Sequence, residues 1–411
     1  MNTYWNVRMK LVQKLRHNLD QRRRLRSRTA LQIALADRFS QLNAQSWQAV
    51  TRGGSFFHSL QYQAAFERFC PLNIEPRYAL ICDGDVPLAT LCMQVVRVDL
   101  QQVGKGSGNK DVEKLRGLVQ QRMLVCGNLL AYGLHGVCFA PDADREKVWP
   151  AVAEALYRTR RAEKLAGHAD LVLIKDLDEA AVEESRVLEK LSYAPVPTEP
   201  NMVLTMNPQW RSHDDYLQSL TAKFRGDIKN RVFKKFNDAG CVIEKLTDVL
   251  GSAAELQNLY LQVHANATLR PFVLPPSYWP VLSEVAGANA VIHVARQGEH
   301  RIGFIVSLKD ADTMFAYHVG FDRAAADRGI PVYLRLLHAS LAQALEFGCR
   351  RVAFGRTGLE AKARMGCQPE STFIWARHRH PLLNQVLLPL LNLIDPEQAP
   401  AYTPFKGPIR P

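Results

Sequence analysis

The sequence lacks several patterns that would place it in a class of protein at once. Its eight cysteines include no C-x-x-C pair and stand mostly within apolar runs, so we expect buried thiols in a reducing compartment, with neither disulfides nor a metal site. No apolar run has the length of a membrane span, and charged residues interrupt the basic N-terminal segment where a signal peptide would be apolar. The sequence therefore predicts a cytoplasmic protein.

Signatures of several enzyme classes are missing as well. The chain has no G-x-S-x-G, no glycine fingerprint of a dinucleotide-binding fold and no H-E-x-x-H. The glycine-rich segment 104–108 lacks the spacing of a phosphate-binding loop. These absences set aside α/β-hydrolases, dinucleotide-dependent enzymes, P-loop proteins and zinc proteases.

Positive charge is what the chain has in excess. Its 411 residues include 52 Lys and Arg against 40 Asp and Glu, for a net charge of +12. This excess favours an anionic partner such as nucleic acid, a nucleotide-bearing substrate or an acidic membrane face, with plain solubility as the alternative. Segment 8–28 is especially basic and has a helix-compatible pattern, so we expect either a contact with anionic lipid or nucleic acid or a solvated leader.

The stretch 313–367 has the pattern of a strand, a helix and a second strand. Aromatic and β-branched residues predict a strand over 313–320, and an apolar stripe after Pro331 predicts a helix that ends at Gly348. Residues 351–354 predict the second strand. Such a crossover points the helix N-terminus at the loop after the first strand, where free backbone N–H groups suit a phosphate or a developing oxyanion.

The rest of the chain predicts the same order of elements twice. The first half shows a hairpin around Gly84, one apolar strand within 123–139, a helix over 148–164, a strand over 171–174 and a helix over 183–191. The second half shows helices over 214–237 and 253–264, a strand over 241–246 and paired strands over 291–296 and 303–309. We expect two copies of one architecture, with the boundary at the prolines of 195–208.

Residues 355–366, Gly-Arg-Thr-Gly-Leu-Glu-Ala-Lys-Ala-Arg-Met-Gly, complete a recognisable pattern. Together with the strand that ends in Gly-Phe-Asp at 320–322 and the Gly-Ile-Pro-Val-Tyr-Leu helix entry at 329–334, it resembles the tandem form of the GNAT acyltransferase superfamily. This group includes BioF2-like acetyltransferase domains and Fem-type peptidyltransferases that use aminoacyl-tRNA. Lys362 resembles the lysine of the family's K-x-x-F/L-G element, whereas the loop after Arg323 departs from the usual R/Q-x-x-G-x-G/A.

The resemblance implies an α/β (α+β layered) fold of two GNAT-like domains, each a mixed, mostly antiparallel sheet flanked by helices. We expect a basic helical leader at 1–44, an N-terminal domain at 45–200, a C-terminal domain with the donor site at 201–380, and an apolar helix and tail at 381–411. The implied activity moves an acyl or aminoacyl group from a thioester or ester donor to an amine-bearing acceptor. Acyl-CoA is the preferred co-substrate, aminoacyl-tRNA and acyl carrier protein are the alternative donors, and no permanently bound cofactor is expected.

Acyl transfer to an amine needs a polarised carbonyl, a proton acceptor and precise positioning of both reactants. The resemblance implies that Lys362 stabilises charge near the leaving group. Without the resemblance, a surface lysine on a helix would be expected here. His318 is a candidate general base at a strand end, and Tyr333 is a candidate proton donor; structural roles are the alternatives.

The other candidates would bind substrate or donor. Arg356 follows a strand end and suits a phosphate or carboxylate, while Asp322 either orients substrate or caps a turn. The full set of substrate-binding candidates is Asp322, Arg356, Thr357, His264, Asn266 and Arg270, and the donor-binding candidates are Gly329, Ile330, Pro331 and Val332.

A hypothesis from another class is a GNAT-shaped protein without catalysis. It would bind an anionic polymer or a membrane surface through Arg22, Arg23, Arg24 and the basic helix between Lys223 and Lys235. The apolar segment 382–394 is too short to span a bilayer, so it closes the core, contacts the inner membrane face or forms a dimer surface. The oligomeric state stays open.

Overall fold

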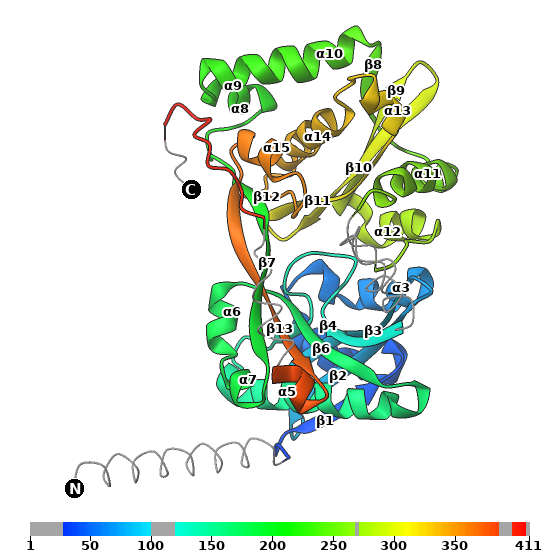
Figure 1. The fold of residues 1–411 in the computed structure, drawn as a ribbon, viewed down its shortest axis with the longest axis vertical. Coiled ribbons are helices and arrows are strands. Elements are labelled where there is room, and N and C mark those ends of the chain that lie inside the picture. The colour runs from blue at the N-terminus through cyan, green and yellow to red at the C-terminus, as the bar shows by residue number, and fades with distance from the viewer. Residues whose placement is uncertain (1–27, 100–119, 268–270, 386–396, 408–411) are drawn as a thin grey trace, which may run out of the picture.

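A computed structural model of the chain describes residues 28–99, 120–267, 271–385 and 397–407. Its strands join into one 13-stranded sheet in the order β1-β2-β3-β4-β6-β13-β7-β12-β11-β10-β9-β8, with β5 paired to β3. Figure 1 shows two layered halves, one above the other, and the long strands β7 and β13 running between them. The basic segment 8–28, including Arg22, Arg23 and Arg24, falls outside the described residues except for Arg28.

The first half is built on a hairpin, as the sequence predicts. Strands β2 (Ile74–Asp83) and β3 (Val86–Asp99) are antiparallel around Gly84, which has a positive φ of 56°. Strands β4 (Gln120–Cys126) and β6 (Ala169–Leu177) are parallel, and α5 (Arg145–Ala162) crosses between them. The remaining elements are β1 (Gln32–Ala36), α2 (Ala44–Thr51), α3 (Leu60–Phe69), β5 (Val137–Phe139), α6 (Glu179–Glu184) and α7 (Val187–Lys190).

The second half contains the predicted strand, helix and strand. Strands β11 (Thr313–Phe321) and β12 (Arg351–Ala353) are parallel, and α14 (Val332–Glu346) connects them, so this prediction is confirmed. Around them lie β8 (Cys241–Lys245), α11 (Ala253–His264), α12 (Tyr278–Ala286), β9 (Ala290–Gln297), β10 (His300–Asp310), α13 (Arg323–Asp327), α15 (Leu359–Arg364) and β13 (Gln368–His378).

The expected linker at 195–208 is a strand instead. β7 (Ala194–Thr205) pairs with β13 over most of its length and with β12 only at Val203–Thr205. The three prolines of β7 come before Val203, where the pairing with β12 begins. They lack an N–H group, and no hydrogen bond to β12 is needed from them. Because β13 also pairs with β6, the two halves share one sheet.

Three other expectations need correction. Residues 32–36, inside the expected helical leader, form β1 and pair with β2. The predicted helix over 183–191 is two short helices, α6 and α7. The apolar run 123–139 is β4, a loop at 127–136 and β5, because Gly127 and Gly133 have positive φ values that break the strand.

The predicted helix over 214–237 is divided into α8 (His213–Ser219), α9 (Ala222–Asp227), a π-helical segment Ile228–Lys234 and α10 (Lys235–Asp238). The break falls at Leu220, which is extended and forms a bridge with Phe405. The next N–H, of Thr221, donates to Pro404 O at 2.8 Å. The C-terminal segment therefore interrupts the helix at this point.

Apolar side chains fill both faces of the second half's sheet. On one face Trp279 and Phe304 pack with α11, α12 and α3, and on the other Ile305 and Leu336 pack with α8, α14 and α15. All eight cysteines are free, and five of them are buried. Among the described helices, none is long and apolar enough to cross a membrane.

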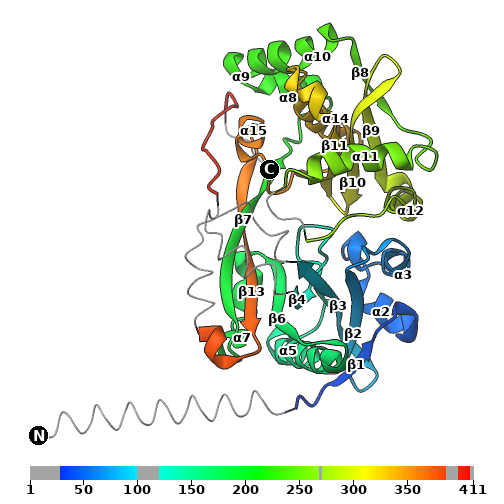
Figure 2. The ribbon, with the colours of Figure 1, turned by 45° about the vertical axis from the view of Figure 1, so that its right-hand side comes forward.

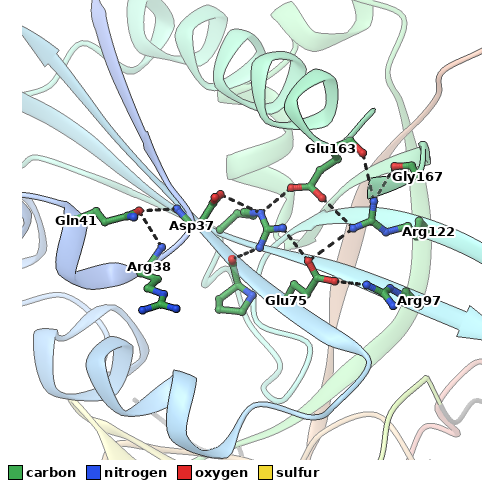
Figure 3. A network of polar contacts seen from close by, with 10 residues as sticks. Asp37, Arg38, Gln41, Glu75, Arg97, Arg122, Glu163 and Gly167 are labelled. Carbon is green, nitrogen blue, oxygen red and sulfur yellow. Dashed lines mark hydrogen bonds and ion pairs between the residues drawn. The ribbon is translucent and has the colours of Figure 1, made fainter. Parts of the chain in front are cut away.

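The first half also holds a buried ion-pair network, shown in Figure 3. Glu163 accepts from Arg77 Nε at 2.6 Å and from Arg122 Nη2 at 2.9 Å, and Glu75 joins both arginines. Buried charges are tolerated when they are paired and hydrogen-bonded in this way. The network ties β2 and the start of β4 to the end of α5.

Candidate active site

The candidate site lies where β11 and β12 separate. These strands pair only between Thr313–Phe315 and Arg351–Ala353, and the chain beyond β12 turns away as the loop 355–358. The pairing of β11 with β10 also shifts by one residue between Val306 and Ser307, which leaves Tyr317 as an extra residue. Separated strand ends of this kind present backbone groups and loops to a ligand.

The N-terminus of α14 faces this region. Pro331 occupies the cap position without a side-chain hydrogen bond. The N–H groups of Tyr333 and Leu334 have no acceptor among the residues that the structure describes, whereas Arg335 N donates to Pro331 O at 3.0 Å. Free N–H groups and the positive end of the helix dipole favour an anion here.

The expected donor-binding residues just before the helix hold the turn instead. Gly329 N and Ile330 N donate to carbonyls of α13, and Val332 N donates to Ile330 O at 2.8 Å. Pro331 has no N–H. The free donors of this loop therefore begin one residue later, at Tyr333.

Lys362 is buried, so the surface-lysine alternative is wrong. It extends from α15, is 1% exposed, and donates from Nζ to Gly355 O at 3.1 Å. Burial lowers the pKa of Lys362 to about 8. A lysine in this state carries charge at neutral pH yet can lose its proton more easily than an exposed lysine.

Tyr333 lies at the other end of the loop 355–358. Its ring packs against Phe321, and its hydroxyl oxygen lies close to Gly358, where an added Cβ would be 3.3 Å away. Burial raises the pKa of Tyr333, so the hydroxyl stays protonated and available as a donor. Lys362 and Tyr333 thus approach the same loop from α15 and α14.

Arg356 reaches from this loop to the first half. Its guanidinium forms an ion pair with Asp176, a residue that is 3% exposed and also accepts from Gly133 N at 3.0 Å. Burial opposes ionisation of Asp176, but Lys175 and Arg356 hold its pKa below the usual value. Because Asp176 engages only one terminal nitrogen of Arg356, the other remains for a carboxylate or phosphate.

Tyr132 of the first half fills the gap between β11 and β12. Its hydroxyl donates to Ala353 O at 2.6 Å and lies 3.3 Å from Ala316 O. Its ring packs on Phe315 and lies against Gly355. The first half therefore forms one wall of the candidate site.

In the first half, the opening that corresponds to the candidate site is filled by the side chain of Lys175. Beyond the ends of the parallel strands β4 and β6, Lys175 Nζ donates to Asn128 O at 2.9 Å and to Ala131 O at 2.7 Å. The nearby helix α5 begins with Asp144, whose carboxylate accepts from Lys147 N. A filled opening and an acidic helix start both disfavour an anionic donor in the first half.

His318 is not brought to Lys362 and Tyr333. Its Nε2 lies 2.8 Å from the hydroxyl oxygen of Tyr278 in α12, and its ring packs against Trp279. The adjacent Val319 instead packs in the cluster that contains α14. Burial lowers the pKa of His318 to about 3, which makes it a poor proton acceptor at neutral pH. The general-base assignment from the sequence is therefore wrong for the arrangement described here.

The remaining candidates lie apart from the loop or serve the backbone. Asp322 caps α13 by accepting from Ala324 N and Ala325 N, as the turn-capping alternative predicts. His264 contacts Phe272 O and Asn266 donates to Gln262 O at the end of α11. Thr357 is exposed on the loop itself, and Arg270 falls outside the described residues.

Sequence reasoning missed Tyr132, Lys175 and Asp176. Two signals were present: glycines inside the apolar run 123–139, and a Lys-Asp pair near the end of β6, the first-half strand that corresponds to β12. Neither signal specifies contact with the second half, because that contact depends on how the shared sheet places β6 beside β13.

Comparison with known proteins agrees with this architecture. Residues 222–363 match the family model described as an acetyltransferase (GNAT) domain. The fold is similar to FemX, with a TM-score of 0.51 at 10% identity over 85% of this chain and 98% of that chain.

Two further solved structures are similar. A tandem GNAT protein from the clavulanic acid biosynthesis pathway gives a TM-score of 0.48 at 11% identity, covering 85% of this chain and 99% of that chain. L-PGS from Bacillus licheniformis gives 0.45 at 12% identity, covering 80% and 95%. No curated protein sequence matches the chain.

Residues 222–363 of the second half thus match a GNAT acetyltransferase domain, and the described fold as a whole is similar to that of FemX. The resemblance and the fold class expected from the sequence are confirmed.

Proposed function

We propose that the protein is an N-acyltransferase whose donor binds in the second half, between the start of α14 and the loop 355–358. It moves an acyl or aminoacyl group from a thioester or ester to an amine. The observation that carries the proposal is the grouping of Lys362, the Tyr333 hydroxyl and the free N–H groups of Tyr333 and Leu334 around one opening of the sheet. The filled opening of the first half supports the choice of half.

The donor in this proposal carries a phosphate group on the arm that leads to the reactive carbonyl. The start of α14 and the free terminal nitrogen of Arg356 suit phosphate oxygens. Acyl-CoA, aminoacyl-tRNA and the acyl arm of a carrier protein all bring such a group. We place acyl-CoA first, with the other two as alternatives.

In the proposed reaction the amine nitrogen attacks the carbonyl carbon, a C–N bond forms, and the C–S or C–O bond of the donor breaks. The leaving thiolate or alkoxide takes a proton from the Tyr333 hydroxyl, which is reprotonated from solvent, while the amine releases its proton to solvent. The Lys362 ammonium stabilises negative charge as it develops beside the loop. Tyr132 and Asp176 hold that loop from the first half.

The test is a transfer assay on the full chain with labelled acetyl-CoA, a long-chain acyl-CoA and charged tRNA, each with a mixture of primary amines. At least one donor should yield an N-acylated product. Lys362→Met should lower that rate by roughly 10²-fold or more, whereas Lys235→Met, at an exposed lysine, should leave it unchanged. Equal rates in both variants would refute the proposed site, and the absence of transfer from all three donors would refute the activity.

A second candidate function rests on the exposed cations of the helix that runs from α9 to α10. Lys223, Lys229, Lys234 and Lys235 are exposed and have no ion-pair partner among the described residues. Such a face suits an anionic polymer or an anionic membrane surface. Binding to tRNA or to anionic vesicles that weakens steeply with salt, is lost in Lys229→Glu/Lys234→Glu and is unaffected by Lys362→Met would support a role without catalysis.

A further inference from the structure

A separate cavity lies between the π-helical segment Ile228–Lys234, the first two turns of α14, and α15. Its volume of about 390 Å³ is within the range of small-molecule sites. Figure 2 shows these helices together on one face of the second half. The walls are apolar, with side chains of Phe224, Ile228, Val232, Leu334 and Met365.

This cavity is distinct from the candidate active site. Ala361 and Arg364 line it from α15, whereas Lys362 points away to Gly355 O. Residues one position apart on a helix are turned by about 100°, so the cavity and Lys362 use different faces of α15. The inference below therefore does not depend on the proposed acyl transfer.

One buried polar side chain, that of His338, faces the cavity. His338 is 2% exposed and lines the cavity, and its Nδ1 lies 3.1 Å from His213 Nε2. Its other ring nitrogen, Nε2, has no hydrogen-bond partner in the described part of the chain. This nitrogen is not among the fully enclosed side-chain atoms that lack a partner, so it is open to the cavity and can form a hydrogen bond with a molecule that enters it.

The imidazole of His338 is uncharged. Burial, together with the neighbouring His213 and Arg335, lowers its pKa well below the usual value. Depending on which histidine donates in the pair, Nε2 of His338 offers either a proton or a lone pair. A hydroxyl group satisfies both cases, because it donates and accepts, and a carbonyl satisfies the first.

The charges at the rim cancel. Asp227 pairs with Arg364 at 2.6 Å and with Arg231 at 3.5 Å, and Glu360 accepts from Tyr402 Oη at 3.2 Å. A charged ligand would gain no net attraction from this rim and would lose hydration among the apolar walls.

The wall itself has an unusual backbone. π-helical turns are rare and occur frequently at functional sites, and here seven consecutive residues, Ile228–Lys234, adopt this conformation. The segment contributes Ile228, Arg231 and Val232 to the cavity.

We propose that this cavity is a binding site for an uncharged, largely apolar small molecule that carries one hydroxyl or carbonyl group, with that group hydrogen-bonded to His338 Nε2. The apolar body contacts Phe224, Val232 and Met365, and the ligand lies against the outer face of α15.

The test uses p-cresol as the probe and toluene as its counterpart without the hydroxyl. The full chain is labelled with ¹⁵N at histidine, and the His338 ring signal is assigned by its loss in His338→Gln, which keeps a polar group beside His213. p-Cresol should shift the His338 signal in a saturable way at millimolar concentration or below. Toluene should bind roughly 5- to 10-fold more weakly, because it lacks the hydrogen bond.

A matched pair of variants locates the binding. Ala361→Leu adds volume inside the cavity and should abolish the saturable shift, whereas Ala324→Leu, at an exposed position of α13, should leave it intact. No saturable shift in the natural chain, or full binding in Ala361→Leu, would overturn the proposal. Equal affinity for toluene and p-cresol would overturn the role given to His338.

Discussion

At the scale of single residues, burial decides between the two roles that the sequence allowed for Lys362, a surface lysine or a site residue. As part of a helix it was expected at the surface unless the family pattern applied, and the structure places it 1% exposed against Gly355 O. A buried ammonium with one carbonyl partner is costly for folding, and such a group is typical of functional sites.

That cost leads to a prediction about pH. Folding lowers the pKa of Lys362 from 10.5 to about 8, so between these values the unfolded chain binds more protons than the folded one, and the contribution of this lysine to stability rises with pH. The stability of the natural chain relative to Lys362→Met should therefore increase by roughly 3 kcal/mol between pH 7 and pH 10.5. Urea unfolding of both chains measures the difference, and parallel pH profiles would contradict it.

Tyr333 gives a prediction about rate. Tyr333→Phe keeps the packing on Phe321 but removes the proposed proton donor, so kcat should fall by roughly 10²-fold with little change in stability. Tyr402→Phe is a suitable control, because that hydroxyl donates to the exposed Glu360 and lies outside the proposed site. Similar kcat values for the two variants would remove Tyr333 from the chemistry.

At the scale of elements, local patterns predicted most helices and strands but not their interruptions. The parallel pair β11 and β12 with α14 follows directly from apolar periodicity and the glycine at 348. The break at Leu220 does not, because it is made by Phe405, far away in the chain. The same holds for β7, whose prolines predicted a linker and whose pairing with β13 makes it a strand.

The candidate site was predictable only in part, because local patterns identify residues that are close in sequence and not those that come from the other half. Lys362, Tyr333 and Arg356 come from one continuous stretch of sequence, and the structure places them around one loop. Tyr132 and Asp176 come from the other half, so no local pattern indicated them. Alternation along the strand did not decide which face His318 takes, and the extra residue at Tyr317 turns it toward Tyr278 of α12.

The contact between Asp176 and Arg356 leads to a prediction about stability. Asp176→Asn would leave Lys175 and Arg356 partly buried without their counter-charge, so the free energy of unfolding should fall by roughly 3–5 kcal/mol. Glu184→Gln, which breaks the exposed pair with Arg145, should cost at most about 1 kcal/mol. Denaturant unfolding compares the two, and equal small losses would show that the buried pair does not hold the halves together.

At the scale of the whole molecule, one sheet joins two halves that are not equivalent. In the first half Lys175 fills the opening and Asp144 caps the helix, whereas in the second half the opening meets a helix start with free N–H groups. The first half instead contributes Tyr132 and Asp176 to the second. The account therefore predicts one donor site per chain, built by both halves.

Calorimetric titration tests this claim most directly. The natural chain, Arg356→Gln and Arg323→Gln are titrated with CoA, acetyl-CoA, a long-chain acyl-CoA and charged tRNA; Arg356 lies on the loop 355–358 of the candidate site, whereas Arg323 is exposed on α13. The account predicts one bound donor per chain, with affinity reduced roughly tenfold or more in Arg356→Gln and little changed in Arg323→Gln. Two bound donors per chain, or equal affinity in all three proteins, would contradict it.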